Sequence, residues 1–256
     1  MPPIRLISTD FDGTLIEHPS DGLCCPHFAD VLQEHRAAGG LWAVNTGRGL
    51  AHAIEGIERF AGPFEPDFLL TNEREIFRRS PHGSWESHDE WNLVCHRRHN
   101  ELFLRSGEII ERLRDLASQK SGITIIEEDD RPVGVVTDSE ELIQEVAAFL
   151  DSERTGAPEF SYQRNTVYLR FCHVDYHKGS ALGELTRMLD LSREEVFAAG
   201  DHFNDIPMLD GQFAAWVCCP SNAIAEVQET VRRAGGYIAR AAGATGIAEG
   251  WRHFHS

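Results

Sequence analysis

The sequence predicts an α/β fold in which a parallel sheet is interrupted by an inserted α+β module. Short apolar runs alternate with segments of helical periodicity early in the chain. This alternation is lost in the middle of the chain and returns after it. Strands that alternate with helices in this way pair in parallel through crossover helices. We therefore expect a discontinuous core domain, residues 1–78 and 173–256, and an inserted domain, residues 79–172.

The first stretch of the chain supplies three strands and two helices to the predicted sheet. An apolar run forms the first strand, and a helix follows whose apolar side chains recur at every third or fourth position. The pair Gly39-Gly40 is a stop signal for that helix, and a second strand, helix and strand come after it. The expected strands are residues 4–9, 41–44 and 67–70, and the expected helices are residues 26–38 and 50–60.

The inserted segment is richer in polar residues and has a pattern of its own. Apolar side chains within residues 109–117 indicate one amphipathic helix, and Asp138 or Ser139 can cap a second. Two pairs of strands complete the segment, and a turn near Asp129-Asp130 joins the first pair. The expected strands are residues 123–128, 132–137, 159–163 and 166–171.

The alternation of strand and helix resumes after the inserted segment. A helix begins near Lys178, and two apolar strands, residues 195–201 and 213–219, follow it. Because these elements have the same character as those at the start of the chain, we assign them to the same sheet. One sheet is thus built from two parts of the sequence.

The bulk composition is that of a globular protein, with 41% hydrophobic and 25% charged residues among 256. The formal net charge of −17 argues against a nucleic-acid partner, which needs a basic face. No apolar stretch reaches the roughly 18–20 residues of a membrane span, and we see no secretory signal, so we expect a cytoplasmic protein without a membrane partner. The cysteines form no CxxC pattern and the histidines form no HExxH motif, so no zinc site is predicted.

Four polar clusters fall at the ends of predicted strands or at a helix start. In an open parallel sheet ligands bind beyond the carboxyl ends of the strands, so clusters far apart in sequence meet there. Any one of them alone fits a structural role as well, as a turn, a helix cap or a surface lysine. The clusters are Asp10 with Asp12, Thr46-Gly47-Arg48, Lys178, and Gly200-Asp201 with Asn204-Asp205.

Phosphoryl transfer to a carboxylate is the chemistry that needs this set of residues. Asp10 can attack phosphorus and form an aspartyl-phosphate intermediate. Carboxylates repel a phosphate, so a hard cation must lie between them, and Mg²⁺ with its preference for oxygen ligands fits. We expect Asp10, the backbone carbonyl of Asp12 and Asp201 to be its protein ligands.

The remaining residues of the clusters have complementary roles in this hypothesis. The Asp12 side chain is free to protonate the leaving alcohol and later to accept a proton from the attacking water. Thr46 can hydrogen-bond the phosphoryl oxygens, and Lys178 can neutralise the nucleophile and the developing negative charge. A further set is expected at the substrate or behind these groups: Gly13, Gly47, Arg48, Asn72, Asn204 and Asp205.

The assembly resembles the haloacid dehalogenase superfamily in its phosphatase branch. Asp-Phe-Asp-Gly-Thr-Leu at 10–15 matches the first motif of that superfamily, Thr46 the second, Lys178 the third and "GDHFND" at 200–205 the fourth. The insertion between the second and third motifs resembles the large α/β cap (type IIB) of the Cof-like group, which includes sucrose-phosphate phosphatases, mannosyl-phosphoglycerate phosphatases and phosphomannomutases. The resemblance implies a Rossmann-like core sheet and a cap that selects the substrate.

One loop departs from the pattern of that group. Cof-like relatives often have Asn-Gly after the third strand, where this sequence reads Thr71-Asn72-Glu73-Arg74. The position that is commonly glycine is therefore a glutamate here.

The leading hypothesis for function is a Mg²⁺-dependent hydrolase of small phosphate monoesters, of which a sugar phosphate is the expected substrate. A phosphomutase on the same scaffold is the alternative, in which the phosphoryl group returns to a second hydroxyl of the sugar. A signalling receiver domain also places acidic residues, Thr and Lys around Mg²⁺, but it is about half this length and lacks an inserted domain. A binding protein without catalysis is disfavoured because all the reacting groups are present.

Overall fold

The chain divides into two compact units in the computed structural model, which describes residues 3–16, 23–128 and 131–255. The first unit comprises Met1–Asn92 with Lys178–Ser256, and the second comprises Leu93–His177. The first boundary thus lies after Asn92 rather than after residue 78, and the second lies after His177 rather than after residue 172. The reason for the first difference is a short strand, Trp85–Ser87, which pairs with the edge of the core sheet instead of joining the insertion.

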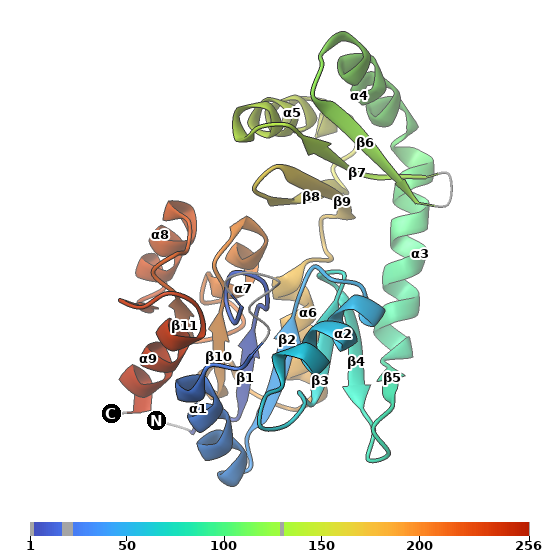
Figure 1. Cartoon of the computed structure of the whole chain (residues 1–256). Helices are drawn as coiled ribbons and strands as arrows, with labels where there is room; N and C mark the ends of the chain where they lie inside the picture. The colour runs from blue at the N-terminus through green and yellow to red at the C-terminus, as the bar shows by residue number, and fades with distance from the viewer. Residues whose placement is uncertain (1–2, 17–22, 129–130, 256) are drawn as a thin grey trace. The chain divides into compact units, whose positions relative to one another are not determined.

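The first unit is built on one sheet, which has eight strands among the described residues, in the order β12-β11-β10-β1-β2-β3-β4-β5 (Figure 1). The strands from β12 to β3 pair in parallel. At the other edge β4 pairs antiparallel with β3, and β5 pairs antiparallel with β4. The central strand β1 (Leu6–Thr9) lies between β10 and β2, and all four of its residues are buried. The predicted parallel α/β core is therefore confirmed.

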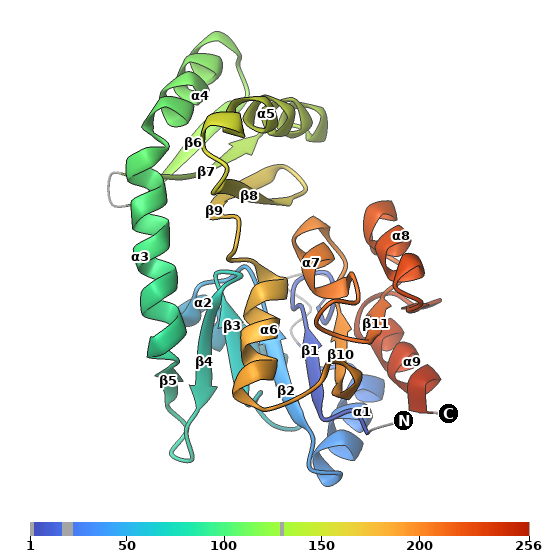
Figure 2. The ribbon, with the colours of Figure 1, turned by 180° about the vertical axis from the view of Figure 1, so that it is seen from behind.

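Helices cover both faces of this sheet, as the two opposite views show (Figures 1 and 2). Ile7 of β1 packs into a core with apolar residues of α1, α2 and α9, whereas Leu6 packs into a second core with residues of α6, α7 and α8. Successive residues of a strand point to opposite faces, so one strand contributes to both cores. This burial on both faces explains why the parallel strands of the sequence are continuous apolar runs.

The elements of the first unit follow the predicted order, with additions at its edge and its C-terminal end. The expected strand and helix segments are present within a few residues of their predicted ends. The strands are β1 (Leu6–Thr9), β2 (Leu41–Asn45), β3 (Phe68–Thr71), β4 (Glu75–Arg79), β5 (Trp85–Ser87), β10 (Val196–Ala199), β11 (Trp216–Cys219) and β12 (Tyr237–Ile238); the helices are α1 (Pro26–Ala37), α2 (Leu50–Phe60), α6 (Lys178–Met188), α7 (Ile206–Leu209), α8 (Ala225–Arg233) and α9 (Gly243–His255), with 3-10 turns η2 (Arg193–Glu195) and η3 (Phe203–Asp205).

The second unit is an α+β module with its own core. Its antiparallel sheet has the order β6-β7-β9-β8 among the described residues, and α4 and α5 pack their apolar faces against it. Ser139 caps α5 by accepting a hydrogen bond from the backbone N–H of Leu142 at 3.2 Å. Of the two predicted caps, Asp138 and Ser139, the structure thus has Ser139. The expected turn at residues 129–130 lies outside the described residues. The elements are α4 (Gly107–Gln119), β6 (Ile123–Glu128), β7 (Arg131–Thr137), α5 (Glu140–Glu153), η1 (Arg154–Gly156), β8 (Phe160–Asn165) and β9 (Tyr168–His173).

One long helix, α3 (Asp89–Arg105), begins in the first unit and continues into the second. The sequence did not predict it, because its residues are strongly polar and lack a clear apolar face. Among the helices of the described residues, none combines the length and apolar character that crossing a membrane requires.

Candidate active site

Asp10 is the first residue beyond β1, and its backbone fixes it to the neighbouring strand. Its N–H donates to the carbonyl of Ala199 at the end of β10, at 2.8 Å. Its carboxylate accepts a hydrogen bond of 2.6 Å from Nζ of Lys178, the first residue of α6. The two residues are 168 positions apart in sequence, and the sheet brings them together as predicted.

Lys178 bridges two carboxylates in the interior of the first unit. Its Nζ also donates to Oδ1 of Asp205 at 2.6 Å, and the lysine side chain is completely buried. Its backbone carbonyl accepts from Nδ2 of Asn45 at 2.9 Å, which fixes the start of α6 against β2. Burial lowers the pKa of Lys178, but the adjacent carboxylates of Asp10 and Asp205 raise it more, so the net shift is upward and the ammonium stays charged.

The acidic residues after β10 complete a tight cluster with Asp10. Carboxylate oxygens of Asp10, Asp201 and Asp205 all lie within 4.8 Å of one another, and the three side chains are buried. Thr14 donates to Oδ1 of Asp201 at 2.7 Å. Oδ2 of Asp205 accepts from the backbone N–H groups of Asp201 and His202, at 2.8 and 2.9 Å. One carboxylate oxygen of Asp205 thus binds Lys178, and the other binds the backbone of the loop after β10. We therefore assign to Asp205 the role of anchoring Lys178 to this loop.

Two glycines make the close approach of these carboxylates possible. Gly13 has φ of +82°, and a Cβ there would lie 2.3 Å from Oδ2 of Asp201. A Cβ on Gly200 would lie 2.4 Å from Cγ of Asp205. No larger residue fits at either position while the cluster keeps its geometry. Sequence reasoning included Gly13 in the set expected at the substrate or behind the reacting groups, and in the structure Gly13 lies against Asp201.

The charges of the cluster do not balance. Burial, and after it the repulsion from Asp205, raises the pKa of Asp10 well above its ordinary value. The same two causes raise the pKa of Asp201 to about 6. Three buried carboxylates face one ammonium, so a further positive charge stabilises their ionised forms. Asp10 accepts a hydrogen bond from Lys178 and Asp201 accepts one from Thr14, and clustered carboxylate oxygens of this kind suit Mg²⁺.

Asp12 is not part of the acidic cluster, because its side chain is held by Arg48. The guanidinium donates from Nε and Nη2 to the two carboxylate oxygens at 2.7 and 2.5 Å, and it lies 4.8 Å above the ring centre of Phe11. The bond to Asp12 is the main reason that the pKa of Arg48 is raised. Gly56 leaves room for the guanidinium, since a Cβ there would approach Nη1 to 2.3 Å.

The loop after β2 meets the loop after β3. The backbone of Thr46 donates to Leu70 at 2.8 Å, and its side-chain oxygen accepts from the N–H of Arg48 at 3.2 Å. The backbone of Asn72 donates to the carbonyl of Arg48 at 2.9 Å. A Cβ on Gly47 would lie 3.3 Å from Oε1 of Glu73. These contacts hold Thr46, Gly47, Arg48 and Asn72 together in one group of loops.

Sequence reasoning missed three polar contributors to the site. Thr14 holds Asp201, Asn45 holds the start of α6, and Glu73 accepts from Nδ2 of Asn204 at 2.8 Å. Thr14 lies inside the first motif and Asn45 directly precedes Thr46, so their positions offered a signal. For Glu73 the signal was the replacement of the glycine that is common at this point of the loop.

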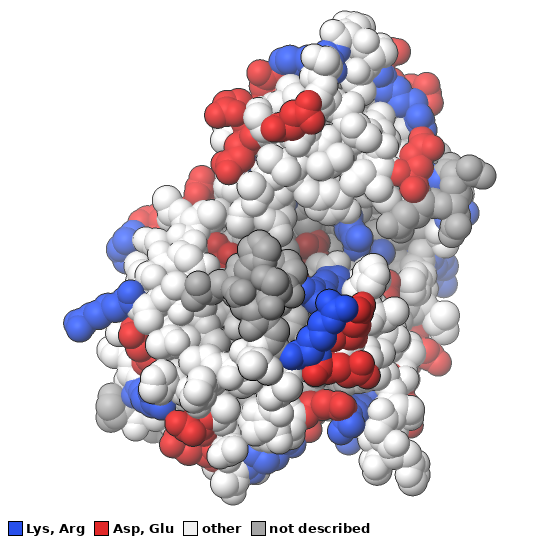
Figure 3. Space-filling view, viewed as in Figure 1, with Lys and Arg blue, Asp and Glu red and all other residues white. Residues whose placement is uncertain are grey.

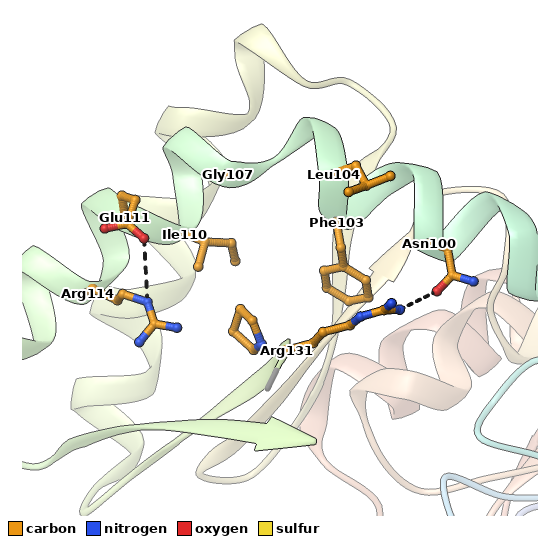
Figure 4. Close-up of a pocket in the computed structure, with 9 residues that line it drawn as sticks. Asn100, Phe103, Leu104, Gly107, Ile110, Glu111, Arg114 and Arg131 are labelled. Atoms are coloured by element: carbon orange, nitrogen blue, oxygen red, sulfur yellow. Dashed lines mark hydrogen bonds and ion pairs between the residues drawn. The ribbon is translucent and has the colours of Figure 1, made fainter. Parts of the chain in front are cut away.

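The second unit has a cavity of about 280 Å³, which Figure 4 shows in close-up. Phe103 and Ile110 supply its apolar wall, and Arg131 at its edge donates to Oδ1 of Asn100 at 2.7 Å. Arg114 is paired with glutamates on its own helix and on β6. Because the polar groups of this cavity are already paired, we assign the chemistry to the acidic cluster of the first unit.

Comparison with known proteins identifies the family. Residues 105–248, more than half of the chain, match the profile of the haloacid dehalogenase-like hydrolases. The chain belongs to this family. The predicted superfamily, its α/β fold and an enzyme of the phosphatase class are thereby confirmed.

Two curated relatives and one solved structure are similar to this hydrolase. A 5-amino-6-(5-phospho-D-ribitylamino)uracil phosphatase of Bacillus subtilis (strain 168) is 26% identical over 98% of this chain and 96% of its own. A glucosylglycerol-phosphate synthase of Pseudomonas anguilliseptica is 38% identical over 34% of this chain, and the match spans only 11% of that relative's length. The sucrose-phosphatase of Synechocystis sp. PCC6803, solved with sucrose and phosphate, has a TM-score of 0.73 at 20% identity, covering 99% of both chains.

Proposed function

We propose that this hydrolase is a Mg²⁺-dependent phosphomonoesterase that acts on a small phosphorylated metabolite, a sugar phosphate or a closely related polyol phosphate. The observation that carries the proposal is the buried contact of 2.6 Å between Asp10 and Lys178, beside Asp201 at the carboxyl end of the sheet. A carboxylate held in this way by a cation is oriented for attack on phosphorus. The three relatives support this substrate class. Each is named for the phosphate ester of a sugar or polyol derivative, which are glucosylglycerol, a ribitylamino compound and sucrose.

Asp10 is the nucleophile of the proposed reaction. One of its oxygens forms a bond to phosphorus while the bond from phosphorus to the ester oxygen breaks, and the phosphoryl group passes to the carboxylate. Lys178 lies against the attacking carboxylate, where it balances negative charge. In this proposal Thr46 would hydrogen-bond the phosphoryl oxygens. Mg²⁺ bound to Asp10, Asp201 and the backbone carbonyl of Asp12 would screen the charge of the incoming phosphate.

Asp12 is the proposed general acid and base. It gives a proton to the departing alkoxide, and in the second half it accepts one from the water that cleaves the aspartyl-phosphate. A carboxylate held by two guanidinium hydrogen bonds acts as an acceptor only. Proton donation therefore requires that Asp12 separate from Arg48, whose two bonds of 2.7 and 2.5 Å hold it in this structure.

A screen of phosphate release tests the proposed function. Purified protein with Mg²⁺ is assayed against sugar phosphates, polyol phosphates and nucleotides, and we expect release of inorganic phosphate from the first two groups. The Asp10→Asn variant should lose at least about a thousandfold in kcat, because the amide is not a nucleophile, while its circular dichroism is unchanged. Asp210→Asn, at an exposed carboxylate after α7, is the matched control and should retain full activity.

Two results would contradict the proposal. Substantial turnover by Asp10→Asn would exclude Asp10 as nucleophile, and isomerised sugar phosphate without free phosphate would identify a mutase. The assignment of substrate selection to the inserted unit stays a prediction.

A further inference from the structure

The loop between β3 and β4 has two consecutive residues in the left-handed region. Asn72 has φ of +49° and Glu73 has φ of +65°. Glycine adopts this conformation freely, whereas a residue with a Cβ is strained in it. The loop keeps the conformation because the backbone N–H groups of these two residues donate to the carbonyls of Arg48 and Thr46, at 2.9 and 3.1 Å. Strain that the surroundings enforce is characteristic of functional sites.

The side chain of Glu73 has a defined contact with the loop that carries the acidic cluster. It is 7% exposed, and its Oε1 accepts from Nδ2 of Asn204 at 2.8 Å. A carboxylate oxygen accepts hydrogen bonds, so the NH₂ group of the amide must face Glu73. The orientation of Asn204 is thereby fixed, and its carbonyl oxygen Oδ1 faces away from Glu73.

The carbonyl oxygen of Asn204 is a buried acceptor without a hydrogen-bond partner in the part of the chain that the structure describes. The residue is 6% exposed and lies in η3 between Asp201 and Asp205. A buried polar atom without a partner is rare in folded proteins and indicates that a ligand or water completes the site. The neighbouring carboxylates are the ones that we assign to the cation and to the anchoring of Lys178.

We propose that Glu73 is a positioning residue, which orients Asn204 so that its Oδ1 accepts a hydrogen bond from a hydrated divalent cation at Asp10 and Asp201. This inference rests on the proposed function, in which Mg²⁺ occupies the acidic cluster. Mg²⁺ retains several waters in proteins, and those waters need acceptors. Residues behind the direct ligands fix the orientation of such acceptors and have a large effect on metal affinity.

Glycine at position 73 separates this role from a merely structural one. It relieves the backbone strain, and it removes the acceptor that holds the Asn204 amide. We therefore expect Glu73→Gly to be at least as resistant to thermal unfolding as the wild type, yet to bind Mg²⁺ more weakly. A glutamate that served only the fold would show the opposite result.

Calorimetric titration of the full-length protein with Mg²⁺ alone measures this difference. For Glu73→Gly we expect the dissociation constant to rise by about 10- to 100-fold, as for other residues behind metal ligands. For Glu73→Gln, whose amide oxygen accepts the same hydrogen bond, we expect a change of at most about threefold. Asp190→Gly is the matched control, because Asp190 also has positive φ, +52°, in the turn after α6, and its replacement should leave Mg²⁺ affinity unchanged.

Wild-type affinity in Glu73→Gly would overturn the inference. A loss in Glu73→Gln as large as in Glu73→Gly would also overturn it, because charge rather than the hydrogen bond would then be the cause. Should Glu73→Gly fail to fold, Glu73→Ala and Asn204→Ala provide the same test. The variant with both alanines should bind Mg²⁺ as weakly as Asn204→Ala alone, and additive losses would show that the two residues act independently.

The titration contains no substrate, so it distinguishes failure of the inference from failure of the proposed function. If the wild type and its variants bind Mg²⁺ in the expected order but release no phosphate from any ester, the proposed function is wrong and the positioning role stands. If phosphate is released and Mg²⁺ affinity is the same in wild type and Glu73→Gly, the positioning role is wrong and the proposed function stands.

Discussion

Lys178 is the residue on which the charge balance of the acidic cluster depends. It contacts Asp10 and Asp205 at 2.6 Å each, in an environment that solvent does not reach. A buried ion pair contributes little net stability, but removal of one partner leaves uncompensated charge and costs about 3–5 kcal/mol. The cluster has an excess of carboxylates even with Lys178 present, and this excess is the physical reason for a cation site there.

His35 gives the stability of the first unit a pH dependence that is unrelated to the active site. Burial lowers the pKa of His35 to about 4, although its hydrogen bond to the carbonyl of Leu41 acts in the opposite direction. In the unfolded chain the pKa of histidine is about 6.5. Between this pH and about 4 the unfolded state therefore binds a proton at His35 that the folded state does not. The free energy of unfolding should therefore fall as the pH drops from about 6.5 through 4.

Urea titrations at several pH values check this dependence. His35→Gln, whose amide can still donate to the carbonyl of Leu41, should show a flatter fall of the unfolding free energy. His27→Gln is the control on the same helix, since His27 is exposed, and it should behave as the wild type. An identical pH dependence in His35→Gln and wild type would refute the assignment.

At the residue scale, the groups that react could be predicted and the groups that orient them could not. Asp10, Lys178 and Asp201 stand at strand ends or helix starts, where the chain order already indicates a common site. Glu73 and Asn45 act through contacts with residues 131 and 133 positions away, and such contacts leave no local pattern. The sequence places Arg48 at the substrate or behind the reacting groups, but it does not indicate Asp12 as the partner of its ion pair.

At the element scale, the predictable segments are those whose pattern follows from burial. The parallel strands are apolar runs because both of their faces are covered, and α5 is amphipathic because one face packs on its sheet. The strand β5 and the helix α3 escaped prediction. β5 has only three residues at a sheet edge, and α3 carries polar residues on most of its surface, so neither has a periodic apolar signal.

The packing of α6 against α7 positions Lys178, and Gly179 permits it. A Cβ on Gly179 would lie 2.1 Å from the backbone carbonyl oxygen of Pro207, so the start of α6 would have to move. We expect Gly179→Ala to lower the free energy of unfolding by about 1–3 kcal/mol, as is usual for overpacking, and to reduce kcat through displacement of Lys178. Urea unfolding and steady-state kinetics measure the two effects.

A second glycine serves as the control for this substitution. Gly107 begins α4 in the second unit, and a Cβ there meets no atom within 4 Å. Gly107→Ala should therefore leave activity unchanged and raise the unfolding free energy by about 0.4–1 kcal/mol through the smaller entropy of the unfolded chain. Equal behaviour of the two variants would show that the contact with Pro207 is not the cause.

At the scale of the whole molecule, net charge is a poor guide to the site. The chain carries −17, and on the face in Figure 3 basic and acidic side chains are interspersed. The cation that matters for an anionic substrate, Lys178, is completely buried, so neither the surface nor the total charge reveals it. The discontinuous core could nevertheless be predicted, because the insertion changes the periodicity of the sequence. Its boundaries in the structure lie after Asn92 and after His177, and the edge strand β5 accounts for the first of these differences.

Binding of Mg²⁺ should be visible in the stability of the whole protein. A ligand that binds only the folded state raises the free energy of unfolding by about 2.7 kcal/mol at 100 times its dissociation constant. In metal-free buffer the repulsion among Asp10, Asp201 and Asp205 opposes folding, so Asp201→Asn should unfold at a higher temperature than the wild type there and gain little from Mg²⁺. The amide oxygen of this variant can still accept from Thr14, which keeps the local structure intact.

Thermal unfolding with and without Mg²⁺ measures both effects in one series. Asp210→Asn is again the control, because its exposed carboxylate lies outside the cluster, and it should follow the wild type in both buffers. A wild-type midpoint that Mg²⁺ does not change would argue against a metal site at the cluster. If the Asp201→Asn variant unfolds at a lower temperature than the wild type in metal-free buffer, hydrogen bonding to the Asp201 carboxylate outweighs the repulsion from Asp10 and Asp205.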